Sequence, residues 1–280
     1  MSVLDSLQPL YSLTGFAVGL LVGLTGVGGG SLMTPLLILL FGIHPATAVG
    51  TDLLYAAATK TAGSAVHTFN RSIDWRVVRR LAAGSVPMTV VTIIALGHLG
   101  IASSAVRDLI TVVLTVALLV TAAALVLRKT IVAHYATRLN ALPPKQISIL
   151  TIAVGAVLGV LVSITSVGAG AIGVTALILL YPKLPTARIV GSDIAHAVPL
   201  TLAAGIGHWF LGSINLEVLF SLLAGSVPGI LIGSYAAPRI PETALRLMLA
   251  GTLVVVATKL ALDIRSVPSS GASVTAITAH

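Results

Sequence analysis

The sequence predicts an all-α polytopic membrane protein made of two inverted-topology repeats, and three observations lead to this class. The 280-residue chain is 56% hydrophobic and only 9% charged, with a mean hydropathy of +1.07, whereas soluble domains carry roughly 25% charged residues. Apolar runs of about 20 residues recur along it, the length that crosses a hydrocarbon core. Two long stretches also match one another at a nearly constant offset.

Ten apolar segments are expected to form the helices. They cover residues 9–26, 30–43, 46–69, 76–97, 105–127, 146–166, 170–181, 186–211, 217–236 and 242–262. The second and seventh are too short to cross a membrane upright, and each follows a glycine-rich break. We expect a first membrane repeat over 1–128, a basic linker over 129–145, a second, inverted repeat over 146–264 and a flexible tail over 265–280.

The internal match indicates a duplication. Shifted by 140, residues 19–40 match 159–180 at 11 of 22 positions; shifted by 141, residues 50–87 match 191–228 at 15 of 38. The pairs include Gly50 with Gly191, Asp52 with Asp193, His67 with His208, and AGSVP at 83–87 with AGSVP at 224–228. Composition alone explains matching leucines and alanines, but not coincident Asp, His, Gly and Pro.

The basic residues predict how the repeats are oriented. Twelve of the sixteen Lys and Arg lie in residues 71–80, 128–145, 182–188 and 237–246. Since Lys and Arg concentrate in cytoplasmic loops, we expect these stretches on the cytoplasmic side of a cell inner membrane. RSIDWRVVRR has four Arg and its repeat equivalent GSINLE has no Lys or Arg, so equivalent loops fall on opposite faces. This topology accounts for the net charge of +8 without nucleic-acid binding.

The glycine-rich breaks predict a substrate site. Inverted repeats interrupted at matching places hold substrate near the membrane midplane. In TGVGGGS and TSVGAGA the chain turns on glycine and restarts as a short, re-entrant-like helix. The first N–H groups of such a helix are unpaired and carry about half a positive charge. Two such starts converging from opposite leaflets favour an anion. The alternative is that the glycines only let neighbouring helices pack closely.

Hydroxyls and one lysine complete the predicted anion site. Hydroxyl groups add donors without fixed charge, so an oxyanion is bound and still released. Lys60, which has Thr201 as its repeat equivalent, is the candidate for a full positive charge; a structural ion pair with an acid such as Asp52 is the alternative. The predicted substrate-binding residues are Thr25, Gly28, Gly29, Gly30, Ser31, Lys60, Thr165, Ser166, Gly168 and Gly170.

Other ionisable residues inside apolar segments are candidates for proton coupling, because a charge at the centre of a membrane helix costs about 2.5–3.5 kcal/mol. These candidates are Asp52, Asp193, His196, His67 and His208. Both Asp follow Gly and a hydroxyl residue, so hydrogen bonding to the breaks is an equal alternative. His67 and His208 lie near segment ends, where an interfacial histidine is ordinary. The chain has no cysteine, which excludes thiolate metal sites, and no metal or cofactor is expected.

The stretch GLTGVGGGSLMTPLLILLFGIHPATAVGTDLLYAAATKTAGSAVHTF resembles the opening repeat of the TauE/SafE sulfite exporter family. A glycine-rich break, a proline after it, a G-x-x-P-x-x-A stretch and a helix ending near His recur there; here these are Gly28–Gly30, Pro35, Gly42–Ala48 and His67. The likeness covers about residues 10–262. It implies an inner-membrane permease for sulfite, sulfonates or similar anions. The second copy has Thr175 for the proline and Ala169 for a glycine, so binding is expected to favour the first half-site.

The predicted function is therefore a secondary transporter, not an enzyme. It moves a small sulfur-containing anion such as sulfite or an organosulfonate by alternating access, coupled to protons. The expected partners are this anion and the lipid bilayer, with a homodimer as a further hypothesis. The alternatives are a passive anion channel that uses the same helix dipoles and an intramembrane aspartyl protease that uses Asp52 and Asp193.

Overall fold

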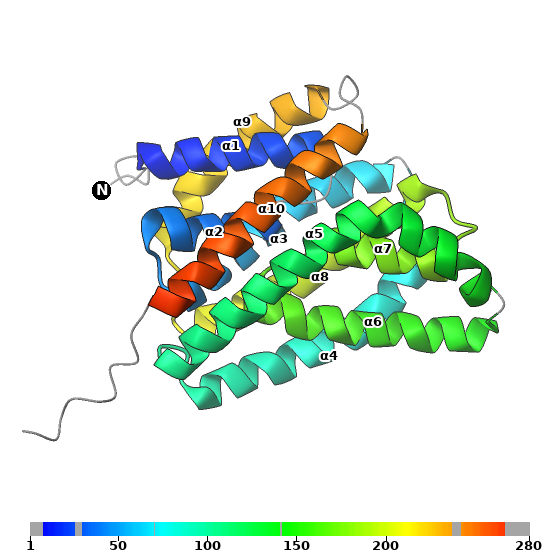
Figure 1. The fold of residues 1–280 in the computed structure, drawn as a ribbon, viewed down its shortest axis with the longest axis horizontal. Coiled ribbons are helices and arrows are strands. Elements are labelled where there is room, and N and C mark those ends of the chain that lie inside the picture. The colour runs from blue at the N-terminus through cyan, green and yellow to red at the C-terminus, as the bar shows by residue number, and fades with distance from the viewer. Residues whose placement is uncertain (1–7, 26–29, 70, 141, 237–241, 267–280) are drawn as a thin grey trace, which may run out of the picture.

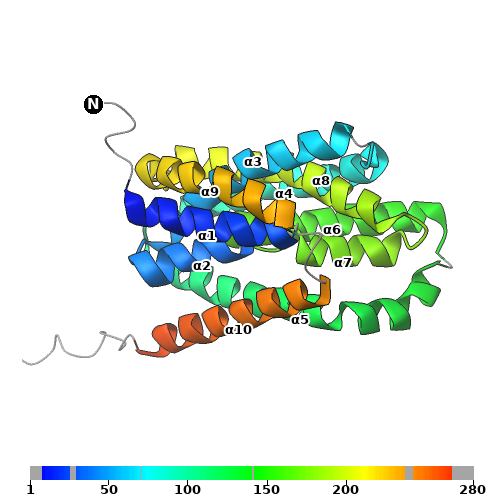
Figure 2. The same cartoon turned by 90° about the horizontal axis from the view of Figure 1, so that it is seen from above.

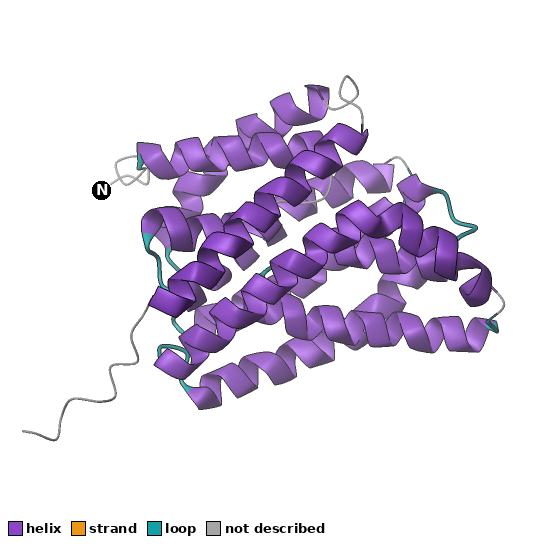
Figure 3. Cartoon of the chain, in the orientation of Figure 1, coloured by secondary structure: helices purple, strands orange, loops and turns teal. Residues whose placement is uncertain are grey.

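A computed structural model describes residues 8–25, 30–69, 71–140, 142–236 and 242–266. Within these residues the chain forms ten α-helices and no strand (Figure 3). The helices are α1 (Pro9–Thr25), α2 (Gly30–Phe41), α3 (Pro45–Phe69), α4 (Trp75–Leu99), α5 (Ser104–Asn140), α6 (Pro144–Thr165), α7 (Ala171–Leu180), α8 (Thr186–Phe210), α9 (Leu216–Ala236) and α10 (Glu242–Ser266).

The helices confirm the prediction of an all-α polytopic membrane protein. Six of them are long and apolar enough to cross a membrane, namely α4, α5, α6, α8, α9 and α10. The described parts of α1, α2 and α7 are shorter apolar helices. Helix α3 has 25 residues but is not among the six, and it carries Asp52 and Lys60 on a segment that is otherwise mostly apolar. The protein is thus a multi-pass α-helical membrane protein in which α3 carries two buried ionisable residues.

Helix α5 differs most from the prediction. We expected a segment over 105–127, but the helix has 37 residues and continues to Asn140, through most of the predicted basic linker. The sequence from Leu127 to Asn140 contains no Gly or Pro, so nothing in it stops a helix until Pro143 and Pro144. The basic residues of this stretch therefore lie on a helix and not in a loop.

The helices form layers. Helices α5 and α10 cross the front of the molecule in Figure 1, and Figure 2 shows α2 and α7 between this pair and the pair α3 and α8. Helices α1 and α9 lie along one side and α4 and α6 along the other (Figure 1). The middle layer is thus formed by α2 and α7 (Figure 2).

Each half of the chain packs on the other. Helix α1 contacts α9, α4 contacts α6, α3 contacts α8 and α5 contacts α10. Glycines allow two of these contacts to be close. A Cβ on Gly15 or Gly19 of α1 meets Leu222 or Ser226 of α9, and a Cβ on Gly155 or Gly159 of α6 meets Leu81 or Ser85 of α4. These two sets are repeat equivalents of each other, so the α1–α9 and α6–α4 pairs pack through glycines at equivalent positions.

The helices also run in related directions. In Figure 1, α3, α5, α7 and α9 run toward the right, and their repeat counterparts α8, α10, α2 and α4 run toward the left. The predicted basic stretches 71–80, 182–188 and 237–246 follow the ends of α3, α7 and α9, and the stretch 128–145 covers the C-terminal part of α5 and the residues after it. Helices with equivalent sequences therefore point in opposite directions within one interlocked bundle.

Candidate substrate-binding site

The second glycine-rich break is a buried turn between α6 and α7. Ser166, Gly168 and Gly170 all have positive φ, of 59°, 117° and 121°, and glycine adopts such angles without steric cost. Thr165 and Ser166 are buried. The Thr165 hydroxyl accepts a hydrogen bond from the Val167 N–H at 3.1 Å. Because this turn is buried, α7 begins inside the protein.

Only part of the first break is described. Gly28 and Gly29 lie outside the described residues, as do the side chains of Thr25 and Ser31, and Gly30 is the first residue of α2.

A residue that sequence reasoning missed, Thr34, lies in the first turns of α2. Its N–H and its hydroxyl both donate to Asp52 Oδ2, at 3.1 and 2.6 Å. The first described polar contact of α2 is therefore with a carboxylate of α3.

Asp193 has the corresponding position at α7. The Gly170 N–H interacts with the Asp193 carboxylate, and Asp193 Oδ1 occupies the space that a Cβ on Gly173 requires. A carboxylate stabilises a helix start by about 0.3–1 kcal/mol, and up to about 2 kcal/mol when partly buried. In the structure each short helix thus has an internal carboxylate beside its first turns, which is the arrangement that the sequence offers as the alternative to proton coupling for both Asp residues.

Lys60 lies between the two acids. It is on α3 with only 7% of its surface exposed, and it interacts electrostatically with Asp52, Asp193 and His196. Within the described residues, the one ion pair shorter than 4 Å joins Arg107 and Asp108. Lys60 is thus a buried cation near two carboxylates without a direct ion pair to either.

His196 and Tyr55 make equivalent hydrogen bonds in the two halves. His196 Nε2 lies 2.8 Å from Ser85 Oγ, and Tyr55 OH lies 2.6 Å from Ser226 Oγ. His196 is the repeat equivalent of Tyr55, and Ser85 of Ser226. Both serines belong to the repeated AGSVP motif, which is the signal in the sequence that could have identified them.

We call this group of residues the polar centre, and it consists of Asp52, Lys60, Ser166, Asp193 and His196. Buried polar atoms without hydrogen bonds are concentrated in it. Among the described residues, five buried side-chain atoms have no hydrogen-bond partner, and four are Asp52 Oδ1, Ser166 Oγ, Asp193 Oδ1 and His196 Nδ1. Each such group costs about 1–3 kcal/mol. Their clustering is typical of a site that exchanges protons or ligands.

The structure does not bring His67 and His208 to the polar centre. Each lies in the last turn of its helix, α3 or α8. His67 Nδ1 is 2.8 Å from Ser72 Oγ, and His208 Nδ1 is 2.9 Å from Ser213 Oγ. Along α3, His67 is about 22 Å from Asp52, at a rise of about 1.5 Å per residue. These contacts fasten the helix ends to the following loops.

A buried polar centre inside a bundle of apolar, membrane-crossing helices defines the class: a multi-pass membrane transporter. The chain belongs to the TauE/SafE family, because the family described as "Sulfite exporter TauE/SafE" matches residues 11–260. This match confirms the resemblance found in the sequence. No solved structure has significant similarity to the chain.

Curated relatives point to the same class. The chain is 39% identical over 249 residues to "Probable membrane transporter protein YjnA" of Bacillus subtilis (strain 168), covering 89% of this chain and 97% of the relative. It is 25% identical over 241 residues to "Probable membrane transporter protein YdhB" of the same organism, covering 85% and 93% of the two chains. The family and these relatives are membrane transporters and not enzymes, so the protease alternative is set aside.

Proposed function

We propose that this protein is a secondary transporter that carries a small sulfur-containing oxyanion, such as sulfite or an organosulfonate, across the cytoplasmic membrane by alternating access, coupled to protons. The observation that carries the proposal is the polar centre itself. A buried lysine and four unpartnered polar atoms lie together where α7 begins. The description of the family as a sulfite exporter supports a sulfur oxyanion as the substrate.

The charges of the polar centre provide the coupling. When Asp52 and Asp193 are ionised, they outweigh the single charge of Lys60, and a substrate anion is repelled. When both acids are protonated, Lys60 leaves one net positive charge. Proton binding and anion binding therefore strengthen each other, and such coupling is reciprocal. The expected transport is symport of the anion with protons.

Protonation also frees the helix starts. The carboxylates of Asp52 and Asp193 act as internal anions at the first turns of α2 and α7. Once a carboxylate is neutral, the partial positive charge of the helix start acts on the substrate instead. In this proposal the substrate contacts the two breaks, through Thr25, Gly28–Gly30 and Ser31 of the first and Thr165, Ser166, Gly168 and Gly170 of the second.

His196 is the proposed proton relay to Asp193. It lies three residues after Asp193 on α8, so both side chains are on the same face of the helix. Its Nε2 is held by Ser85, and its Nδ1 has no partner among the described residues. Imidazole exchanges protons near neutral pH.

Alternating access is supported by the arrangement of the halves. Equivalent helices run in opposite directions (Figure 1), as in an inverted repeat, and the site lies where the halves meet. In transporters of this kind, one repeat moves against the other around the fixed site. The four basic stretches then face the cytoplasm.

The proposal is tested with purified protein in lipid vesicles. Uptake of sulfite, methanesulfonate, sulfate, acetate and nitrate is measured at an acidic and an alkaline pH, with protein-free vesicles as the control. We expect sulfite or methanesulfonate to accumulate against its gradient when a proton gradient is imposed. Flux that carries current but ignores the proton gradient selects the passive channel. Transport of acetate or nitrate alone contradicts the proposed substrate class.

A further inference from the structure

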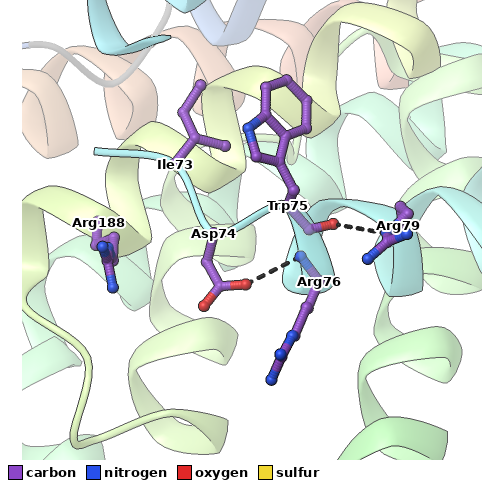
Figure 4. Close-up of a pocket in the computed structure, with 6 residues that line it drawn as sticks. All are labelled: Ile73, Asp74, Trp75, Arg76, Arg79 and Arg188. Carbon is purple, nitrogen blue, oxygen red and sulfur yellow. Dashed lines mark hydrogen bonds between the residues drawn. The ribbon is translucent and has the colours of Figure 1, made fainter. Parts of the chain in front are cut away.

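Three arginines line a surface pocket that shares no residue with the polar centre (Figure 4). The pocket has a volume of about 470 Å³ and is open to the surface. It lies where α4 begins and beside the first turn of α8. Its lining residues are Ile73, Asp74, Trp75, Arg76, Arg79 and Arg188.

The arginines can bind an anion through their guanidinium groups, of which that of Arg79 also donates through Nε to the Trp75 carbonyl at 3.3 Å (Figure 4). Asp74 is the one acid in the lining, and its Oδ1 accepts hydrogen bonds from the N–H groups of Arg76 and Val77 at 2.9 and 3.3 Å. This carboxylate therefore caps α4. None of the exposed residues Arg76, Arg79 and Arg188 takes part in an ion pair within the described residues. The guanidinium group matches the geometry of oxyanions through paired hydrogen bonds.

One residue of the pocket lining is hydrogen-bonded to the helix that carries Asp193 of the polar centre. The Asp74 N–H donates to Ser192 Oγ at 2.8 Å, and Ser192 precedes Asp193. The neighbouring Gly191 packs directly on the Ser72 carbonyl. An anion held by the arginines thus lies at the outer end of the helix that carries Asp193.

The other half repeats the frame of this pocket without its charge. The Asn215 N–H donates to Thr51 Oγ1 at 3.1 Å, which is the repeat equivalent of the bond between Asp74 and Ser192. However, the equivalents of Arg76, Arg79 and Arg188 are Glu217, Phe220 and Thr47. The same loop geometry is therefore basic on one face of the protein and contains an acid on the opposite face.

We propose that the arginine pocket is a loading site that captures a dissolved oxyanion on the arginine-rich face, before it enters the polar centre. This inference rests on the proposed function. A cleft with charges of one sign raises the local concentration of an oppositely charged substrate by about 10–1,000-fold, and salt weakens the effect. The phosphate of a lipid headgroup has the same chemistry, and the test separates the two sources.

The test measures transport from each face separately. Since the chain has no cysteine, a single Ala102→Cys change in the α4–α5 loop reports orientation through labelling with a membrane-impermeant thiol reagent. In vesicles of phosphatidylcholine alone, the triple variant Arg76→Gln, Arg79→Gln, Arg188→Gln is expected to raise KM for sulfite from the arginine-rich face by about tenfold. Its kcat and its KM from the opposite face stay as in the parent. Raising the salt concentration reduces the KM difference between parent and variant.

Arg71→Gln is the matched control, because Arg71 is an exposed arginine in the same loop but outside the lining, and its KM is expected to stay unchanged. An unchanged KM in the triple variant overturns the loading site while the proposed function stands. A defect that requires phosphatidylglycerol in the vesicles assigns the pocket to a lipid headgroup and also overturns it. Absence of any oxyanion flux in the parent from either face overturns the proposed function, and the loading role with it.

Discussion

The two halves of this protein share a frame and differ in chemistry. Both place a carboxylate beside the start of a short helix, both fasten a helix-end histidine to a serine five residues later, and both use the serine of AGSVP to bond a side chain of the other half. The differences lie at single positions. Lys60 and Tyr55 of the first half correspond to Thr201 and His196 of the second.

This comparison separates scaffold from function. The recurring contacts between histidine and serine hold loops and helices in place, whereas the recurring carboxylates also belong to the polar centre. Lys60, His196 and the three arginines of the pocket are among the residues that break the repeat. We therefore expect substitutions of the shared packing glycines to change stability in both halves alike, and substitutions in the polar centre to change binding or coupling.

The largest effect is expected at Lys60, the cation without a counterpart. Lys60→Met removes the full positive charge that faces the anion, and anion binding is expected to weaken by about a hundredfold, in the range for loss of one partner of a buried charge pair. The thermal stability of the variant should not fall, because the lost ammonium is buried without a direct ion pair. Binding is measured by calorimetry on purified protein. Lys259→Met, an exposed lysine on α10, is the control, and parental affinity in Lys60→Met would falsify the assignment.

The second largest effect, a loss of folding stability, is expected at the glycines through which helices pack in both halves. A Cβ on Gly84 runs into the Ile152 carbonyl, and a Cβ on Gly225 runs into the Ser12 carbonyl. Gly84→Ala and Gly225→Ala are each expected to cost about 2 kcal/mol, or about thirtyfold in the folding equilibrium. Unfolding is followed by circular dichroism. Gly251→Ala, where no atom lies within 4 Å of the new Cβ, should be neutral or stabilising, and unequal losses at the two packing sites would break the equivalence.

A smaller effect is expected when the carboxylate of the second half is neutralised. Asp193→Asn resembles the protonated acid, so sulfite should bind about tenfold more tightly at alkaline pH, since removing one nearby charge is worth about 1.4 kcal/mol in a partly shielded site. In the parent, affinity should rise as the pH falls, and in the variant this rise should be weaker. Asp108→Asn, an exposed acid paired with Arg107, serves as the control. Weaker binding in Asp193→Asn would mean that the carboxylate itself contacts the substrate.

The smallest effect on affinity is expected when one residue of the second half is replaced by its equivalent from the first half. His196→Tyr gives the second half the residue that the first half has at Tyr55, and the tyrosine hydroxyl replaces the bond to Ser85. We expect at most about a threefold change in sulfite affinity, because a hydrogen bond contributes about 0.5–1.5 kcal/mol and here it is retained. Proton-driven accumulation should be lost. Full coupling in the variant would exclude His196 as the relay and leave the two carboxylates to act alone.

The sequence alone determined the class and the positions of nearly all the helices, and its internal match predicts the duplication. The lengths of the apolar runs and the glycine-rich breaks can be seen directly in the sequence, and the matches at a fixed offset come from comparing the chain with itself. None of these observations requires knowledge of how the helices pack. The end of α5 was missed because the basic residues after Leu127 were interpreted as a linker, although no residue there interrupts a helix.

Only the tertiary structure decided which groups meet. Ser85 and His196 are 111 residues apart, and Tyr55 and Ser226 are 171 apart, and each contact depends on a helix of one half crossing a helix of the other. The same is true of the carboxylates: Asp52 lies beside Thr34 of its own half and Ser166 of the other. Helical periodicity places a residue on a face, but the crossing of interlocked helices decides what that face contacts.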